Sequence, residues 1–247
     1  MGLMRRAAVA ALALGLLISG CVSAPQEAGG MPKSTFSPSD EIRFQDVELR
    51  SQDGTRLSGT FLEYPDANDS VGVLFLHMLG SERTAWRDLQ ASVPHPSLAV
   101  DFRGHGNSEG GLKAFSDSDY AKFVDDARAG VEFLASTGAT RFYVAGASIG
   151  ANSALALASS DPRVERIAML SPGLDYHGVK TEGLPESFKG ESLYAVAGGD
   201  EYSLASTKRL YSSASQPKAI ETLKGNAHGT GMLNDRDFYD ALAEFLE

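Results

Sequence analysis

A glycine-flanked serine stands at Gly146-Ala147-Ser148-Ile149-Gly150, between a β-branched and aromatic run at 141–145 and a run of small residues at 151–155. This succession predicts a strand, a sharp turn and a helix. The G-x-S-x-G pattern is typical of a nucleophile elbow, in which strained backbone projects the serine hydroxyl over the edge of the sheet. The plainer interpretation is a glycine-rich turn with a capping serine, and the rest of the sequence has to decide between the two.

Two later segments supply partners for Ser148. A nucleophilic serine needs a base to take its proton and a carboxylate to orient that base. His228 lies in a loop after the strand-like run 218–223, and Asp200 follows the buried-strand pattern 192–197 through two glycines. We therefore expect Ser148, Asp200 and His228 to form a catalytic triad at the carboxyl ends of parallel strands.

The chain order of serine, aspartate and histidine is that of the α/β-hydrolase superfamily, and two loops strengthen the resemblance. The run 73–81 is an apolar strand that enters a loop, and the run 101–108 is similar to the family's D-x-R-G-x-G-x-S loop. The resemblance spans roughly residues 41 to 247. Within the superfamily the chain resembles the serine esterase or dienelactone-hydrolase-like branch, although the dienelactone hydrolases proper use a cysteine where this chain has Ser148.

The resemblance also implies an oxyanion hole, formed by the backbone amides of Leu79 and Ile149. Two preorganised amides would stabilise the negative charge that develops on a carbonyl oxygen. Met78 stands where the family usually has a glycine after the histidine, so Met78 remains an alternative to Leu79 as the first donor.

The alternation of apolar strand patterns with helical patterns predicts an α/β fold. We expect a mostly parallel eight-stranded sheet with helices on both faces, the α/β-hydrolase fold. The only segment between the sixth and seventh strands that could form a cap is 173–190, so the cap should be minimal. The expected strands are 41–50, 56–64, 71–77, 97–102, 141–146, 164–170, 192–197 and 218–223, and the expected helices are 82–92, 116–136, 149–160, 201–214 and 231–246.

The other four histidines favour structural roles. His77 and His105 lie in the two family-like loops, where we expect them to hydrogen-bond the backbone. His95 and His177 are interpreted as ordinary loop residues, with a place in the substrate cleft as an alternative for His177. The sequence contains no H-x-x-x-H motif, no pair of cysteines and no dinucleotide fingerprint, so we expect neither a metal nor a cofactor.

The amino terminus resembles a bacterial lipoprotein signal peptide. Arg5 and Arg6 precede the apolar run 7–18, and Ile18-Ser19-Gly20-Cys21 supplies a lipobox ending in the chain's one cysteine. Acylation of Cys21, for example with palmitate, would anchor the mature protein to a membrane. An ordinary secretory signal and a short uncleaved anchor remain alternatives. The expected organisation is a signal peptide at 1–20, the lipidated cysteine with a flexible tether at 21–40, and a hydrolase domain at 41–247.

The net charge of the chain limits its possible partners, and the residue after Cys21 indicates a location. The formal net charge of −10 makes nucleic acid an unsuitable partner. An anionic membrane surface would also repel the acidic domain, so the lipid on Cys21 should hold the domain at the cell envelope, outside the cytoplasm. Val22 follows the cysteine where an aspartate would indicate inner-membrane retention, which favours the outer membrane in a Gram-negative host. The sequence leaves the oligomeric state open.

These features together predict a serine hydrolase that cleaves carboxylic esters with short or medium acyl groups through an acyl-enzyme. Peptidases and thioesterases share the fold and remain alternatives. A non-catalytic, envelope-tethered binding protein is a further alternative, although such a protein has no need of all three triad groups.

Overall fold

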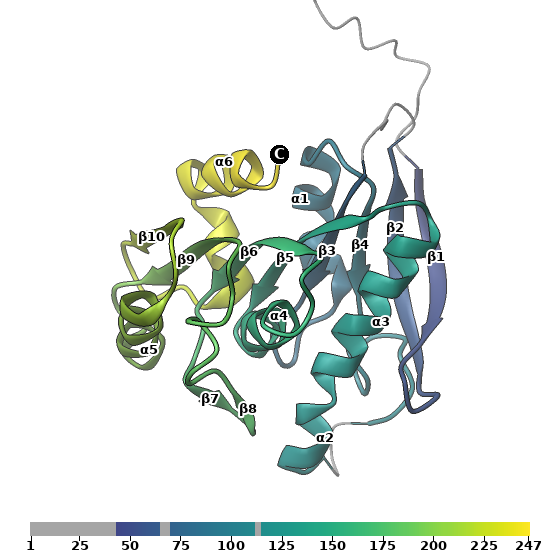
Figure 1. Cartoon of the computed structure of the whole chain (residues 1–247), viewed down its shortest axis with the longest axis horizontal. Helices are drawn as coiled ribbons and strands as arrows, with labels where there is room; N and C mark the ends of the chain where they lie inside the picture. Colours follow the sequence, from purple (N-terminus) through teal and green to yellow (C-terminus); the bar gives the residue numbers. More distant parts are fainter. Residues whose placement is uncertain (1–42, 65–69, 112–114) are drawn as a thin grey trace, which may run out of the picture. The chain divides into compact units, whose positions relative to one another are not determined.

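An eight-stranded sheet forms the centre of the part that the computed structural model describes, residues 43–64, 70–111 and 115–247 (Figure 1). Its strands are β1 Arg43–Arg50, β2 Arg56–Glu63, β3 Val71–Leu76, β4 Ser97–Val100, β5 Arg141–Ala147, β6 Val164–Leu170, β9 Glu191–Ala197 and β10 Lys218–Leu223. Their spatial order is β1-β2-β4-β3-β5-β6-β9-β10. β2 is antiparallel to both β1 and β4, and the other neighbouring pairs are parallel, which confirms the predicted mostly parallel sheet.

Helices cover both faces of the sheet, which explains why a central strand such as β3 is apolar along its whole length. The helices are α1 Arg87–Ser92, α2 Asp117–Ala121, α3 Phe123–Ser136, α4 Ile149–Ala158, α5 Glu201–Ser213 and α6 Arg236–Phe245. α3, α4 and α5 pack on one face, and α1 and α6 pack on the other (Figure 1). The predicted α/β class and the two covered faces are therefore both confirmed.

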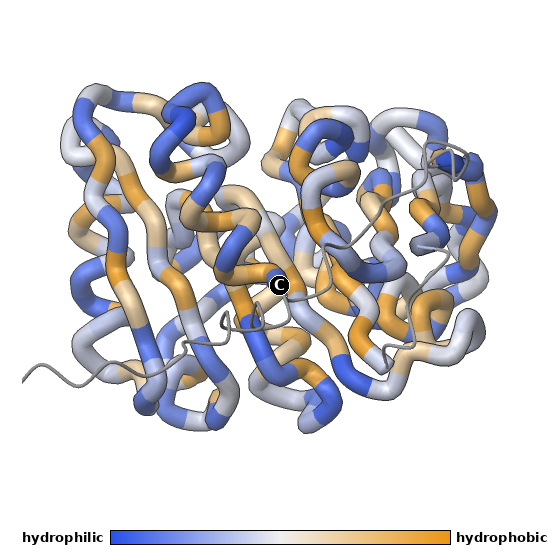
Figure 2. The backbone as a smooth tube through the Cα atoms, turned by 90° about the horizontal axis from the view of Figure 1, so that it is seen from above, coloured by the Kyte–Doolittle hydropathy of each residue, from blue (hydrophilic) through white to orange (hydrophobic). Residues whose placement is uncertain are grey.

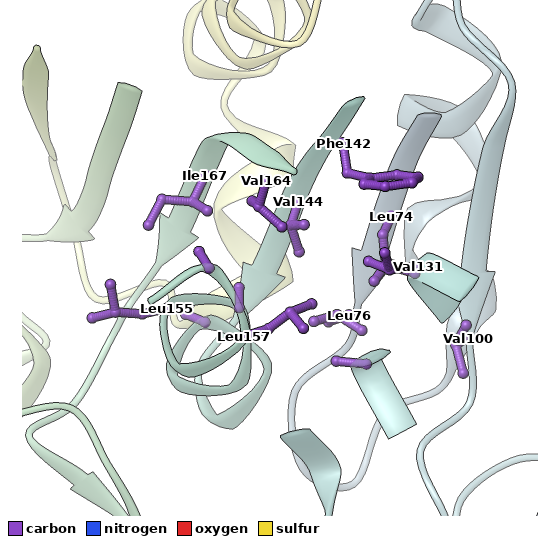
Figure 3. Close-up of a cluster of buried hydrophobic side chains, with 14 of the residues drawn as sticks. Leu74, Leu76, Val100, Val131, Phe142, Val144, Leu155, Leu157, Val164 and Ile167 are labelled. Carbon is purple, nitrogen blue, oxygen red and sulfur yellow. The ribbon is translucent and has the colours of Figure 1, made fainter. Parts of the chain in front are cut away.

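Two hydrophobic cores result, one on each face of the sheet. Figure 3 shows part of the first, in which side chains of β3, β5 and β6 meet side chains of α3 and α4, among them Leu74, Val144, Ile167, Val131 and Leu155. The second core joins the opposite face of the sheet to α1 and α6. Along the backbone, hydrophobic and hydrophilic residues alternate as the helices turn between core and solvent (Figure 2). Packing in the two cores holds the strands in place, and with them the loops that follow the strand ends.

Three predicted helices differ in detail from the structure. The range 82–92 contains a 3-10 helix, Arg83–Trp86, ahead of α1. The range 231–246 overlaps another 3-10 segment, Gly229–Asn234, which precedes α6. Asp235 separates that segment from α6 because its backbone is extended and its carboxylate caps the Phe238 amide. The helix expected at 116–136 is interrupted at Lys122, whose ψ of −7° ends α2 and starts α3.

The segment 173–190 contains a small hairpin rather than a plain loop. β7 Asp175–Tyr176 pairs with β8 Val179–Lys180. The two turn residues, His177 and Gly178, both have positive φ, as tight hairpin turns require. The hairpin is short, in agreement with the expected minimal cap.

The predictions for the amino terminus lie outside the described residues. They comprise the signal peptide at 1–20, the lipid attachment at Cys21 and the tether at 21–40. Within the described ranges, no helix has both the length and the apolar character that crossing a membrane demands.

Candidate active site

Ser148 occupies the sharp turn between β5 and α4, with φ of +52° and ψ of −119°. Such a backbone conformation is costly for a residue with a side chain and is found where function maintains it. The flanking glycines make the turn possible. A Cβ on Gly146 would lie 2.2 Å from the Gly150 carbonyl oxygen, and a Cβ on Gly150 would lie 2.4 Å from the Leu76 carbonyl oxygen. The serine is therefore presented by a tightly packed strand-turn-helix, as the pattern predicted.

Asp200 and His228 form a direct hydrogen bond, with Nδ1 of His228 2.6 Å from Oδ2 of Asp200. Asp200 also caps α5, because its other oxygen accepts the backbone N–H of Ser203 at 3.3 Å. Burial alone would raise the pKa of Asp200, but the hydrogen bonds from His228 and Ser203 outweigh burial and lower it. The carboxylate is thus ionised at neutral pH, and it holds the proton of the imidazole on Nδ1. In the neutral form of the ring, Nε2 is then the hydrogen-bond acceptor.

The three predicted triad residues lie on loops at one edge of the sheet, where β5, β9 and β10 end. The loop of His228 packs directly on the turn that carries Ser148, since a Cβ on Gly229 would lie 3.3 Å from the Ala147 Cβ. Ser148 is 7% exposed, whereas the His228 side chain is 40% exposed. A substrate could therefore approach the histidine from solvent without a covering domain having to move.

The residues expected to form an oxyanion hole have amides without acceptors in the part of the chain that the structure describes. The Ile149 amide is at the first turn of α4, where backbone N–H groups have no intrahelical partner. No described group accepts the amides of Met78 or Leu79 either. The sulfur of Met78 lies 3.8 Å from the Thr230 hydroxyl, so this side chain joins its loop to the His228 loop. A glycine at this position could not make that contact.

His77 and His105 hold the loops together as neutral imidazoles. His77 donates from Nδ1 to the Met78 carbonyl at 2.8 Å and accepts the Phe102 N–H on Nε2 at 3.0 Å. His105 accepts the Gly80 N–H on Nε2 at 3.2 Å. Burial lowers the pKa of His77 to about 4 and also lowers that of His105. These contacts agree with the structural roles expected for both histidines.

Two buried ion pairs support the loop at 101–108. The Asp101 carboxylate binds the Arg83 guanidinium and also accepts the Asn107 N–H at 3.0 Å. The guanidinium of Arg103 lies 2.6 Å from Oδ1 of Asp126, whose side chain is fully buried. These charges are satisfied within the scaffold, so the loop has a structural role beneath the candidate site.

The remaining two histidines contact other parts of the fold. Nε2 of His95 is 3.0 Å from the Glu247 carbonyl oxygen, and the ring is buried. His177 is exposed in the β7–β8 turn, and its ring lies against that of Tyr120, tilted by 31° with centroids 4.6 Å apart. Among the described residues, no group of three or more His, Cys, Asp or Glu side chains could hold a metal ion.

Sequence comparison agrees with this geometry, because residues 73–245 match the model of the alpha/beta hydrolase family. The chain belongs to this family. An uncharacterized protein of Mycobacterium tuberculosis is 26% identical to it over an alignment of 232 positions, which covers 82% of this chain and 79% of that protein. This alpha/beta hydrolase is therefore similar along most of its length to a relative of comparable size.

Solved structures of other hydrolases share the fold. An esterase from Pyrococcus furiosus superposes with a TM-score of 0.69 at 19% identity, covering 83% of this chain and 90% of that one. An enol-lactonase from Burkholderia xenovorans superposes with a TM-score of 0.64 at 15% identity, covering 81% and 99%. At these identities the likeness shows the fold of this alpha/beta hydrolase, and the chemistry has to be argued from its own residues.

Sequence reasoning missed three residues that adjoin the site. Tyr176 projects its phenol from β7 to the hydroxyl of Ser203 and to the backbone of Ser171. Burial raises the pKa of Tyr176, and hydrogen bonding with the side chains of Ser203 and Ser148 partly offsets that rise. No local pattern marks Tyr176 or Ser171. Ser203 alone carried a signal, because it stands three positions after Asp200, where a capping carboxylate finds its amide.

Proposed function

We propose that this protein is a serine hydrolase that cleaves carboxylic esters with short or medium acyl groups. The observation that carries the proposal is the 2.6 Å hydrogen bond between Asp200 and His228, on a loop that packs against the strained turn of Ser148. A capping serine in an ordinary turn needs neither the positive φ nor an oriented imidazole. Membership of the alpha/beta hydrolase family supports the same class of reaction.

In the proposed mechanism, Oγ of Ser148 attacks the acyl carbon while its proton passes to Nε2 of His228. Asp200 keeps the other ring proton on Nδ1 and stabilises the imidazolium. The amides of Ile149 and Leu79 receive the negative charge on the former carbonyl oxygen. The tetrahedral intermediate collapses, the alcohol leaves with the proton from Nε2, and an acyl-serine remains. Water then attacks the acyl-serine by the same proton route, which releases the carboxylic acid and restores the serine.

The minimal cap supports a preference for short or medium acyl groups. The β7–β8 hairpin is too small to enclose a long acyl chain, and the half-exposed ring of His228 keeps the leaving-group side open to solvent. Long lipid chains gain from an enclosed apolar cavity, and a hairpin of two two-residue strands offers little surface from which to build one. The similarity in fold to an esterase and an enol-lactonase supports ester or lactone carbonyls as the substrates to try first.

The test is labelling with a fluorophosphonate, followed by kinetics on an ester panel graded by acyl length. We expect the wild-type protein to be labelled and Ser148→Ala to be inert, with kcat reduced by at least ~10³. Ser153→Ala is the matched control, because this serine lies in α4, directly after the turn of Ser148, and its hydroxyl donates to the Ile149 carbonyl. An unlabelled wild-type protein would favour a binding role, and faster turnover of amides or thioesters would favour a peptidase or thioesterase.

We also propose that lipid on Cys21 holds this activity at the cell envelope, on the outer membrane in a Gram-negative host. The support is the lipobox in the sequence. Cys21→Ala should move the protein from the membrane to the soluble fraction, or leave an unprocessed precursor, with hydrolysis of a small soluble ester unchanged. Membrane retention of a Cys21→Ala chain that has lost its signal peptide would contradict the proposal. A chain without residues 1–40 should fold and keep its esterase activity, because the strands begin at Arg43.

A further inference from the structure

The phenol of Tyr176 joins two buried serines behind the candidate triad. Its hydroxyl oxygen lies 2.9 Å from the Ser203 hydroxyl and 3.2 Å from the Ser171 carbonyl oxygen. Both serines are fully buried. The ring of Tyr176 also meets the ring of His228 edge-on, with centroids 6.3 Å apart. Tyr176 therefore belongs to the wall of the site. Its hydroxyl lies close to the Ser148 side chain, and its two shortest hydrogen bonds are made to the supporting residues Ser203 and Ser171.

The first of these serines supports the acid. Ser203 lies in the first turn of α5, and its backbone N–H is the group that binds Oδ1 of Asp200. The other carboxylate oxygen binds His228, so any rotation of this turn would move the acid against the imidazole. The bond from Tyr176 to the Ser203 hydroxyl holds the turn from the side of the β7–β8 hairpin.

The second serine supports the histidine loop. Ser171 follows β6 with a φ of +53°, which is uncommon for a residue other than glycine and is maintained only where the surroundings require it. In this conformation its hydroxyl accepts the backbone N–H of Gly229, the residue after His228, at 3.1 Å. Its carbonyl oxygen meanwhile accepts the phenol of Tyr176.

The direction of each hydrogen bond follows from the chemistry of the partners. A carbonyl oxygen can only accept, so Tyr176 donates its single proton to Ser171. The Ser203 hydroxyl must then donate to the phenolic oxygen. Because burial raises the pKa of Tyr176, the phenol stays protonated and this arrangement persists at neutral pH. The Tyr176 hydroxyl thus completes a hydrogen-bonded circuit that links Ser203, which binds Asp200, to Ser171, which binds the loop of His228.

We propose that Tyr176 is a positioning residue, whose hydroxyl locks Ser203 and Ser171 so that Asp200 and His228 keep their mutual geometry. This inference rests on the proposed hydrolase function. Because Tyr176 acts on the alignment of the base, its loss should affect the chemical step more than substrate binding.

Tyr176→Phe tests the proposal, because it keeps the ring and removes only the hydroxyl. Tyr202→Phe is the matched control. The Tyr202 phenol also ties the hairpin to the first turn of α5, through the backbone N–H and carbonyl of Asp175 at 3.1 and 2.9 Å, but it touches neither Ser171 nor Ser203. We expect Tyr176→Phe to lower kcat by about 10- to 100-fold with little change in KM, and Tyr202→Phe to leave kcat near the wild-type value.

Two further measurements separate positioning from simple destabilisation. The proton that His228 shares with Asp200 should give a downfield NMR resonance in the wild-type protein, and this resonance should shift or broaden in Tyr176→Phe. A denaturant unfolding curve should show that the variant is still folded. Ser203→Ala should lower kcat similarly, and the double variant should lose little more, because both changes break one circuit. Ser203→Thr, which keeps a hydroxyl, should restore much of the rate.

Three results would overturn the proposal. They are equal kcat in Tyr176→Phe and Tyr202→Phe, a higher KM with unchanged kcat, and fully additive losses in the double variant. Failure of the proposed function itself looks different, since the wild-type protein would then resist the fluorophosphonate and hydrolyse no ester. The unaltered histidine resonance in Tyr176→Phe would count against positioning even in that case.

Discussion

Acidification should unfold this protein partly through His77, which is buried beneath the candidate oxyanion loop. In the folded chain its Nε2 accepts the buried N–H of Phe102, which a protonated ring cannot do. Burial lowers the pKa of His77 from the ordinary 6.5 to about 4. Above pH 6.5 the ring is neutral in both the folded and unfolded states, so it adds no pH dependence there. As the pH falls from 6.5 towards 4, the unfolded state binds a proton that the folded state refuses, and stability is lost.

The size of the effect follows from the difference between the two pKa values. Each unit of pKa difference corresponds to about 1.4 kcal/mol, so a folded-state pKa of about 4 implies a loss of about 3 kcal/mol across this window. His105 adds a loss of the same sign, because burial lowers its pKa as well. A loss of about 3 kcal/mol is a large part of the 5–15 kcal/mol that typically stabilises a domain.

Urea unfolding at a series of pH values between 7.5 and 4.5 measures this loss. His77→Gln offers an uncharged acceptor near the position of Nε2, so its unfolding free energy should fall less steeply between pH 6.5 and 4.5 than that of the wild-type protein. His177→Asn is the control, because His177 lies in an exposed turn whose positive φ suits asparagine. Identical pH slopes for the wild type and His77→Gln would refute the reasoning, since the buried imidazole would then not resist protonation.

Three further outcomes are expected. Asp200→Asn should reduce ester turnover far more than Glu201→Gln, because Asp200 bonds the imidazole whereas Glu201 is exposed. Steady-state kinetics measure both effects, and a lower kcat in Glu201→Gln than in Asp200→Asn would assign the acid to Glu201. Gly150→Ala should destabilise the fold by at least about 1–3 kcal/mol in denaturant unfolding, because its Cβ would meet backbone oxygens at 2.4 and 2.6 Å. Asp126→Ala should cost about 3–5 kcal/mol by the same measurement, since it leaves the buried guanidinium of Arg103 with only a partly exposed carboxylate beside it.

Much of the fold could be predicted because its signals are local. Apolar runs of strand length, separated by helical patterns, located all eight strands of the large sheet to within a few residues. The helix breaks were not predicted, because Lys122 carries no signal of its own and a helical pattern continues across it. The hairpin at 175–180 was also missed, since two-residue strands are too short to show a period.

The sequence by itself determined the α/β architecture, the strained serine turn and the order of its candidate partners. Each of these depends on residues adjacent in the chain, such as the two glycines beside Ser148, or on the position of a residue just after a strand. The tertiary structure alone decided how Tyr176 closes the circuit between Ser171 and Ser203 and why Met78 contacts the His228 loop. These contacts join loops that follow different strands, so they exist only once the parallel sheet has brought the strand ends together.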